Sequence, residues 1–268
     1  MSDVTPTPRA RIAQQLRDLG VEAGAVLLVH TSFRAVGPVE GGPCGLIDAL
    51  TDTLGPEGTL VMPSWLDGDS PFDPMNSETS RSLGAVAAAF WRLPDVRRSD
   101  HPNAFAARGP AAERILKDPL PLPPHIPESP VGRVHELDGQ VLFLGVNHDA
   151  DTTIHLAEIL GGAPYRITKH CTILREGVPT RIEYGENDHC CERFRFVDDW
   201  LRVAGLQAEG VVGRAAARLT RSRAIVKSVL PHLREDRFVF LHPVEAGCAE
   251  CNEAWSSLDT ARTFGNEA

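Results

Sequence analysis

The residues best suited to acid–base chemistry lie in one segment of the sequence, from Leu144 to Glu158. A strand is expected to end there in a polar loop, with Asp151 as the N-cap of the helix that follows. His155 then falls in the first turn, and Glu158 follows three residues later on the same helical face. A helix N-terminus disfavours the imidazolium ion, so His155 is expected to stay neutral and able to accept a proton. The competing interpretation is a polar helix start with a partly buried histidine.

A second group of residues could bind a metal. The motif Cys248-Ala-Glu-Cys251 has the spacing that lets two thiolates reach one ion, and Asp188-His-Cys-Cys191 offers three further ligands. We therefore expect a structural zinc held by Cys248, Cys251 and two of His189, Cys190 and Cys191, with Cys171 and His170 as further possible ligands. Such a site would attach the C-terminal tail to the main lobe. A redox pair or simply buried thiols are the alternatives.

Two other functions use the same polar residues. In a zinc hydrolase, His148, Asp149, Asp151 and His155 would hold a catalytic metal beside an activated water. The absence of a His-x-x-x-His or His-x-Asp-His cluster weakens that hypothesis. A non-catalytic protein that sequesters cationic sugars is the other alternative.

The elements that must position these residues alternate between helix and strand. Apolar periodicity predicts helices over residues 8–19, 43–54, 83–93, 192–203 and 214–230, and another that begins near 152. Strands are expected over 25–30, 59–62, 140–146, 166–174, 180–184 and 237–241. The proline-rich stretch 119–130 is expected to be a rigid surface or active-site segment. This order predicts an α/β fold, a mixed β-sheet flanked by helices, in one domain over 1–268. Its main lobe would cover about 1–165, and a smaller lobe and tail about 166–268.

Composition limits the partners. The 268 residues carry a net charge of −9, which disfavours nucleic acid as a ligand and suits a cationic one. No apolar run is long enough to cross a membrane, and the first ten residues do not form a signal peptide. We expect a cytoplasmic protein, either a monomer or a homodimer, without a membrane partner.

Several ordered motifs resemble the aminoglycoside 3-N-acetyltransferase family. They are His30-Thr-Ser-Phe, Gly42-Pro-x-Gly-Leu, Gly58-Thr-Leu-Val-Met-Pro-Ser-Trp65, Arg98-Ser-Asp-His-Pro102, Ser129-Pro-Val-Gly132 and Thr152-Thr-Ile-His-Leu-Ala-Glu158. Three more are similar to the class IV branch, whose members acetylate apramycin: Pro121-Leu-Pro-Pro-His125, Glu186-Asn-Asp-His-Cys-Cys-Glu-Arg-Phe194 and Glu245-Ala-Gly-Cys-x-x-Cys251. The resemblance covers nearly the whole chain.

The resemblance implies an antibiotic-resistance enzyme that moves acetyl from acetyl-CoA to the 3-amino group of a deoxystreptamine aminoglycoside. It implies that His155 is the general base of a direct transfer within a ternary complex, oriented by Glu158, Glu186 or Asp188. The implied CoA contacts are Thr31, Ser32, Phe33, Val36, Gly37, Ser99, His101 and Ser129. The carboxylates expected to bind the cationic drug are Asp67, Asp69, Glu158, Glu186 and Asp188.

Overall fold

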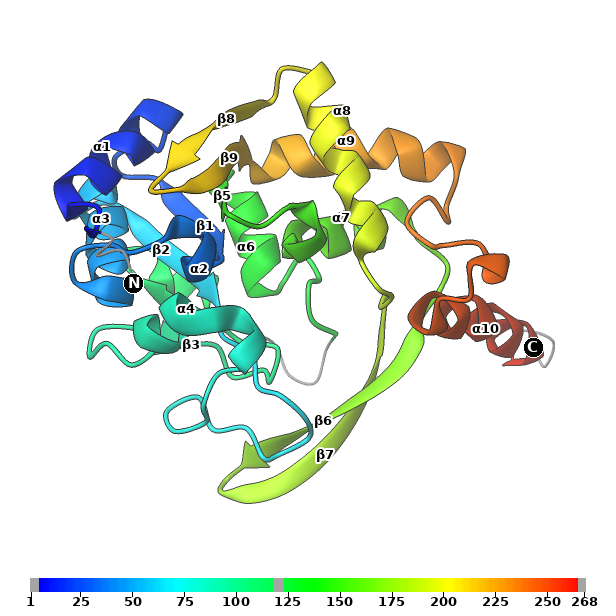
Figure 1. Ribbon diagram of the computed structural model, residues 1–268. Coiled ribbons are helices and arrows are strands. Elements are labelled where there is room, and N and C mark those ends of the chain that lie inside the picture. The colour runs from blue at the N-terminus through cyan, green and yellow to red at the C-terminus, as the bar shows by residue number, and fades with distance from the viewer. Residues whose placement is uncertain (1–4, 118–122, 265–268) are drawn as a thin grey trace.

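The centre of the protein is a seven-stranded mixed β-sheet (Figure 1), and the computed structural model describes residues 5–117 and 123–264. The strand order is β3-β4-β2-β1-β5-β9-β8. Strand β1 pairs in parallel with β2 and β5, and the other neighbours are antiparallel. The strands are β1 (Val26–Thr31), β2 (Thr59–Pro63), β3 (Arg97–Arg98), β4 (Phe105–Arg108), β5 (Gln140–Leu144), β8 (Gln207–Val212) and β9 (Ala215–Arg221). The predicted α/β fold with a mixed sheet is confirmed.

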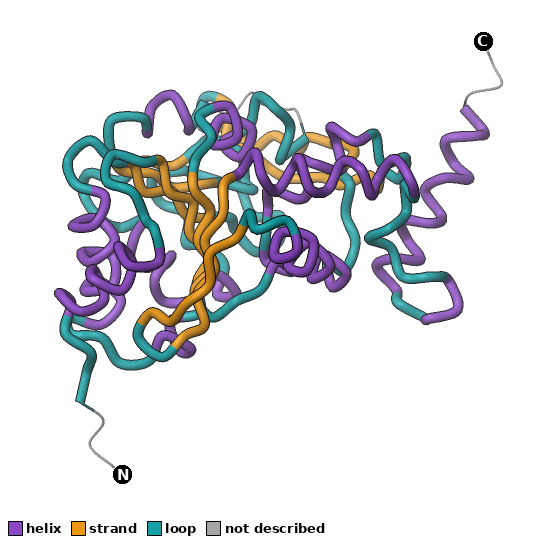
Figure 2. The backbone as a smooth tube through the Cα atoms, turned by 90° about the horizontal axis from the view of Figure 1, so that it is seen from above, coloured by secondary structure: helices purple, strands orange, loops and turns teal. Residues whose placement is uncertain are grey.

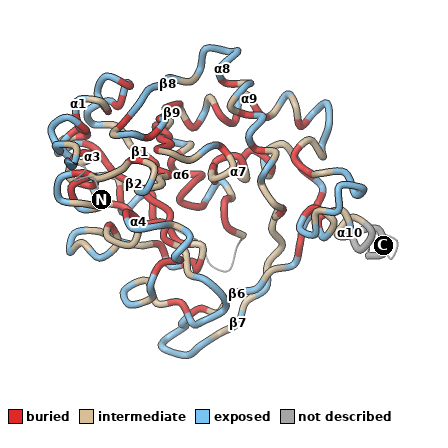
Figure 3. The backbone as a smooth tube through the Cα atoms, viewed as in Figure 1, coloured by how far each residue is buried: buried red, intermediate tan, exposed pale blue. Residues whose placement is uncertain are grey.

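Helices cover both faces of this sheet. Alternate residues of β1 point to opposite sides, because side chains alternate along a strand. Leu27 and Val29 join one hydrophobic cluster, and Leu28 joins the other. Helices α1 (Arg9–Leu19), α3 (Gly42–Leu54) and α4 (Gly84–Phe90) pack on the first face. Helices α6 (Pro130–Glu136), α7 (Thr152–Gly161), α8 (Phe196–Val203) and α9 (Ser222–Glu235) pack on the second, as Figures 1 and 3 show. The short helices α2 (Phe33–Val36) and α5 (Ala112–Ile115) and the C-terminal α10 (Ala249–Phe264) complete the set.

A long β-hairpin lies outside the main sheet. Its strands are β6 (Ile167–Arg175) and β7 (Val178–Glu186), which pair only with each other among the described strands. Near its turn, Ile173 bridges Phe72, and the Thr172 hydroxyl donates to Asp69 Oδ1 at 2.8 Å. The hairpin therefore spans from the end of α7 to the loop that follows β2 (Figure 1). Figure 2 shows that α10 projects away from the sheet.

Two element predictions were wrong. Residues 215–221 form β9, where a helix was expected from 214, and residues 237–241 are turns, where a strand was expected. Alanine and arginine favour helices, but pairing of Ala217 with Leu144 of β5 overrides that local preference. Strands β8 and β9 belong to the main sheet, so that sheet extends beyond the expected lobe boundary at 165.

The proline-rich stretch 119–130 can be compared with its prediction only in part. Of the proline-rich stretch, residues 119–122 lie outside the described part of the chain, and Pro130 begins α6. No helix in the described ranges is long and apolar enough to span a bilayer.

Candidate active site

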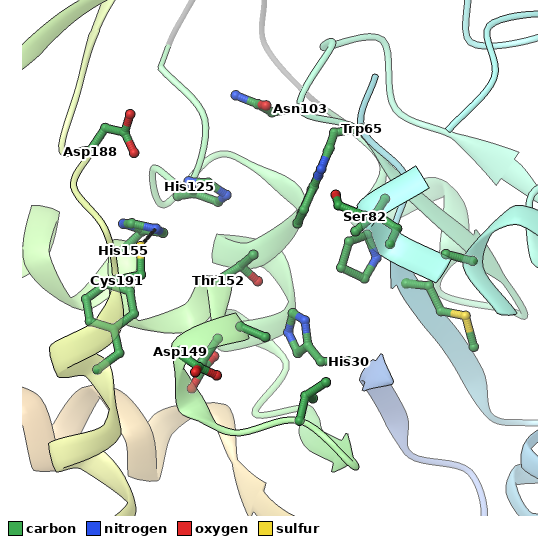
Figure 4. Close-up of a pocket in the computed structure, with 18 of the residues that line it drawn as sticks. His30, Trp65, Ser82, Asn103, His125, Asp149, Thr152, His155, Asp188 and Cys191 are labelled. Carbon is green, nitrogen blue, oxygen red and sulfur yellow. Dashed lines mark hydrogen bonds between the residues drawn. The ribbon is translucent and has the colours of Figure 1, made fainter. Parts of the chain in front are cut away.

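A cavity of about 530 Å³ opens at the carboxyl ends of the three parallel strands (Figure 4). Thr31 of β1 and Pro63 of β2 line it, as does Val146, two residues after β5. The connection from β1 runs to β2 on one side, whereas β5 lies on the other side of β1. Ligands of open α/β sheets bind at such a reversal of strand order. The opposite wall comes from the hairpin, which contributes Lys169, His170, Tyr184 and Glu186.

Helix α7 carries His155 into this cavity. Asp151 caps the helix by accepting a hydrogen bond from the Thr153 backbone N–H at 2.9 Å. His155 Nδ1 donates to Glu158 Oε2 at 2.9 Å, so its Nε2 is the nitrogen able to accept a proton. Cys191 Sγ lies 3.5 Å from that Nε2 and also lines the cavity. The structure thus brings His155 and Glu158 together as their helical spacing predicts.

Glu158 is fully buried and accepts hydrogen bonds from three side chains. Besides His155, they are Tyr165, through its hydroxyl, and His189, whose Nε2 donates to Oε1 at 2.9 Å. Burial alone would raise the pKa of Glu158, but His189 and His155 outweigh it and lower the pKa to about 2. The carboxylate is therefore ionised at neutral pH and fixes the tautomer of His155.

The same contacts change the expected charge of His155. Burial lowers its pKa, but Cys191 and Glu158 more than offset that effect and raise the pKa well above 6.5. The direction of this shift is opposite to the one expected from the helix N-terminus, because Cys191 and Glu158 lie against the ring. When it is neutral, His155 is a stronger proton acceptor than a free imidazole.

Carboxylates line one side of the cavity. Glu186 and Asp188 both face it, and Asp188 Oδ2 accepts from Lys169 Nζ at 2.5 Å. Burial raises the pKa of Glu186 to about 7. Neither Glu186 nor Asp188 contacts His155 by a hydrogen bond in the described part of the chain, so Glu158 is the carboxylate that orients the ring.

Asp67 and Asp69 do not line the cavity. Asp69 pairs with His170 Nε2 at 3.1 Å and accepts from Thr172, while Asp67 accepts from the backbone of Arg81 at 3.3 Å. Through Asp69 the loop after β2 is attached to the hairpin, and through Asp67 its first part is attached to Arg81 at its C-terminal end.

A separate group of sulfur and nitrogen atoms lies beside α10. Cys190, His242, Cys248 and Cys251 place one ligand atom each within 4.8 Å of the others. Cys190 Sγ is 3.6 Å from Cys251 Sγ and 3.9 Å from His242 Nδ1. Two thiolates on a tetrahedral zinc at about 2.3 Å would stand roughly 3.8 Å apart, so these residues fit the ion.

His189 and Cys191 are not part of this group, contrary to the predicted zinc site. The side chains of residues 189–191 alternate in direction. Cys190 faces α10, whereas His189 contacts Glu158 and Cys191 contacts His155. His242 completes the group of four donor atoms, and only its place six residues before Cys248 could have indicated it. Cys171 lies buried in the hairpin, outside the group.

The residues of the hydrolase alternative do not converge on one point. His148 is buried, and its Nδ1 and Nε2 are bonded to Asp151 and Gln207, each at 2.9 Å. Asp149 pairs with Arg195 instead. The described part of the chain therefore does not assemble this ligand set.

A sequence profile of the family described as aminoglycoside 3-N-acetyltransferase matches residues 28–234. The chain belongs to the aminoglycoside 3-N-acetyltransferase family. It is 61% identical over 241 residues to aminoglycoside N(3)-acetyltransferase IV of Salmonella sp, covering 89% of this chain and 92% of that protein. It is 32% identical over 245 residues to an aminoglycoside N(3')-acetyltransferase-like protein of Bacillus subtilis (strain 168), covering 81% and 89%.

Solved structures of another member of the acetyltransferase family have the same fold. The apoenzyme of aminoglycoside acetyltransferase AAC(3)-IVa matches with a TM-score of 0.93 and 58% identity, over 96% of this chain and 100% of that one. A histidine-to-alanine mutant of that enzyme was solved with a gentamicin, and it matches equally well. The same mutant with apramycin matches with a TM-score of 0.87 and 56% identity, over 92% and 99%.

In the present protein, Thr31 is the one residue among the CoA contacts implied by the resemblance that lines the cavity. Ser99 and Ser129 are buried, and they accept hydrogen bonds from Phe105 N–H and Gly132 N–H. His101 is buried against Tyr184, and Val36 lies in the core. Ser32, Phe33 and Gly37 lie at α2, outside the cavity wall, and CoA contact there stays a prediction.

Several cavity residues of the acetyltransferase were not expected to act there. His30, His125, Lys169 and Trp65 line the cavity, and Tyr165 and His189 support Glu158 from behind. The motifs quoted for the family contain His30, Trp65 and His125. The sequence does not show that these residues line one cavity, because that depends on how their strands and loops pack together.

Proposed function

We propose that this protein transfers the acetyl group of acetyl-CoA to the 3-amino group of deoxystreptamine aminoglycosides such as apramycin and gentamicin, and so confers resistance. The observation that carries the proposal is the pairing of His155 with a buried, ionised Glu158 at a cavity lined by Glu186 and Asp188. The base would suit an amine nucleophile, and the carboxylates would suit a polycationic sugar.

We infer a direct transfer in a ternary complex. The substrate amine would take the place of the Cys191 thiol beside His155 Nε2. His155 would accept a proton from that amine as its nitrogen attacks the thioester carbonyl, while Glu158 stabilises the imidazolium across Nδ1. As the carbon–sulfur bond breaks, His155 would return the proton to the departing CoA sulfur.

A thiol-release assay tests this function. Purified protein is mixed with acetyl-CoA and, in turn, with apramycin, gentamicin and an amine that lacks deoxystreptamine, and His155→Ala is the control. We expect CoA release with the two drugs and its loss in the variant. Drug binding without CoA release would favour the sequestering alternative and overturn the proposed transfer.

We further propose that Cys190, His242, Cys248 and Cys251 hold a structural zinc. Their donor atoms and mutual distances fit a closed tetrahedral site. When bound, the ion would tie α10 and the loop before it to the segment that carries His189 and Cys191.

A further inference from the structure

His125 lines the cavity with its ring against that of His155. It has a left-handed backbone with φ 65°, a conformation that only a few per cent of residues other than glycine adopt. Its ring stacks on the ring of His155, with centroids 5.1 Å apart and planes 19° from parallel. Phe105 packs edge-on against the His125 ring, with centroids 6.5 Å apart. Figure 4 shows His125 directly beside His155 at the cavity wall. Left-handed residues other than glycine cluster at functional sites, and this one holds a polar ring against the proposed base.

Among the described residues, nothing uses the polar atoms of this ring. Only 10% of the His125 side chain is exposed, and neither ring nitrogen has a hydrogen-bond partner within residues 5–117 and 123–264. The nearest candidate, Glu186 Oε1, lies 3.7 Å from Nδ1, which is too far for a hydrogen bond. Buried polar groups are nearly always satisfied, so a nitrogen in a cavity wall without a partner among the described residues is available to bond a ligand atom.

The protonation state of His125 defines what that ligand atom must be. Burial lowers its pKa well below 6.5, and the neighbouring His155 and His101 lower it further. A neutral imidazole keeps one N–H donor at neutral pH and one acceptor nitrogen. Glu186, whose pKa burial raises to about 7, lies on the Nδ1 side. When that carboxyl group is protonated it faces an acceptor Nδ1, and the N–H of the neutral ring is then on Nε2, from which it can donate into the cavity.

On the basis of the proposed acetyl transfer, we propose that His125 is a further catalytic residue, which donates a hydrogen bond to the thioester carbonyl oxygen of acetyl-CoA. His155 Nε2 must lie beside the attacking amine, so the carbonyl group is held close to the ring stacked on His155. As the N–C bond forms, the carbonyl π electrons move onto oxygen, and His125 stabilises that oxyanion. His155 takes the amine proton, and His125 keeps its own proton throughout. The C–S bond then breaks as the carbonyl re-forms.

A pair of substitutions separates donation from packing. His125→Phe keeps an aromatic ring against His155 but removes the donor. His125→Asn keeps an N–H donor and suits the left-handed backbone. We expect His125→Phe to lower kcat by about 10²- to 10³-fold, as loss of one oxyanion donor does elsewhere, with KM for both substrates changed by less than roughly threefold. His125→Asn should recover part of that loss. His232→Asn, which alters a histidine stacked on Trp200 outside the cavity lining, is the matched control.

Infrared spectroscopy tests the contact without turnover. With acetyl-CoA labelled with ¹³C at the carbonyl, we expect the C=O stretch to move to lower frequency on binding to the wild-type protein and to return toward its solution value in His125→Phe. Affinity for S-ethyl-CoA, a thioether without the carbonyl, should be the same in both proteins. An unshifted carbonyl stretch in the wild-type complex would overturn the proposal.

Kinetic outcomes distinguish other roles. A rise in KM for the drug with unchanged kcat would make His125 a drug contact, and a shifted acid limb of kcat/KM would make it a positioning residue for His155. Either result would overturn the proposed donation. Failure of the wild-type protein to release CoA with any aminoglycoside would instead refute the proposed function, whatever the infrared result.

Discussion

Glu158 and His189 form a hydrogen bond of 2.9 Å in which both side chains are fully buried. The two residues come from α7 and from the segment before α8, 31 positions apart. Because the other carboxylate oxygen accepts from His155, the orientation of the His155 ring also depends on the contact between Glu158 and His189. The Glu158 carboxylate is thus a fixed element of the site.

Glu158→Gln should lower the activity and also shift its pH dependence. The carboxylate helps to raise the pKa of His155, whose neutral form is the base, so wild-type kcat/KM should rise as pH increases through that raised pKa. In the variant the acid limb should move to lower pH. We also expect kcat at its plateau to fall by about 10²-fold or more, because the tautomer is no longer enforced. Profiles of kcat/KM between pH 5 and 9 measure both effects. The exposed Glu57→Gln is the control, and an unmoved acid limb in Glu158→Gln would refute the assigned pair.

Lys169→Met should strengthen the binding of a cationic drug. The Lys169 ammonium pairs with Asp188 at the cavity wall and so competes with the ammonium groups of the substrate. Because both side chains are about one-third exposed, the gain is modest, about two- to fivefold in Kd. Calorimetric titration with gentamicin at low and high salt measures it. Lys227→Met, on the solvent side of α9, should bind as the wild type does. Weaker binding by Lys169→Met would instead mean that Lys169 contacts the drug favourably.

Asp151→Asn should reduce stability most at low pH. Burial lowers the pKa of His148, but Asp151 and Gln207 outweigh it and raise the pKa above 6.5. A raised histidine pKa stabilises the folded state fully below 6.5, and this contribution disappears as pH rises through the folded value. We expect the variant to lose about 3 kcal/mol of unfolding free energy at pH 6, since a buried pair is broken, and less at pH 9. Urea unfolding at the two pH values measures the difference, with the exposed Asp18→Asn as control. An equal loss at both values would contradict a charged His148.

Cys251→Ser should abolish the zinc binding proposed for Cys190, His242, Cys248 and Cys251. The wild-type protein purified from zinc-containing medium is expected to hold one zinc per chain by mass spectrometry. The variant should hold far less, and its melting temperature should fall, because metal binding adds to folding free energy. Cys44→Ser, at an exposed thiol outside the group, should keep both values. Equal zinc content in Cys251→Ser and the wild type would rule out this ligand set.

The parts of the site that sequence alone predicts are those that lie within one element. Asp151, His155 and Glu158 belong to a single helix and its cap, so helical spacing is enough to place them together. The contact of Glu158 with His189 joins separate elements and depends on how α7 packs.

The same distinction explains the errors. The pair Cys248 and Cys251 is local and was recognised, but the sequence does not reveal which side chains of 189–191 face α10. Likewise β9 is a strand because β5 and β8 pair with it, whereas its alanines and arginines favour a helix.

The β6–β7 hairpin and helix α7 line the same cavity but are anchored independently. The hairpin supplies Lys169 and Glu186 to the cavity wall, yet it pairs with none of the described strands of the main sheet. The base and its carboxylate belong instead to α7, whose packing the hairpin does not determine. Substitutions in the hairpin are therefore expected to change the shape and charge of the cavity wall while leaving the contact between His155 and Glu158 in place.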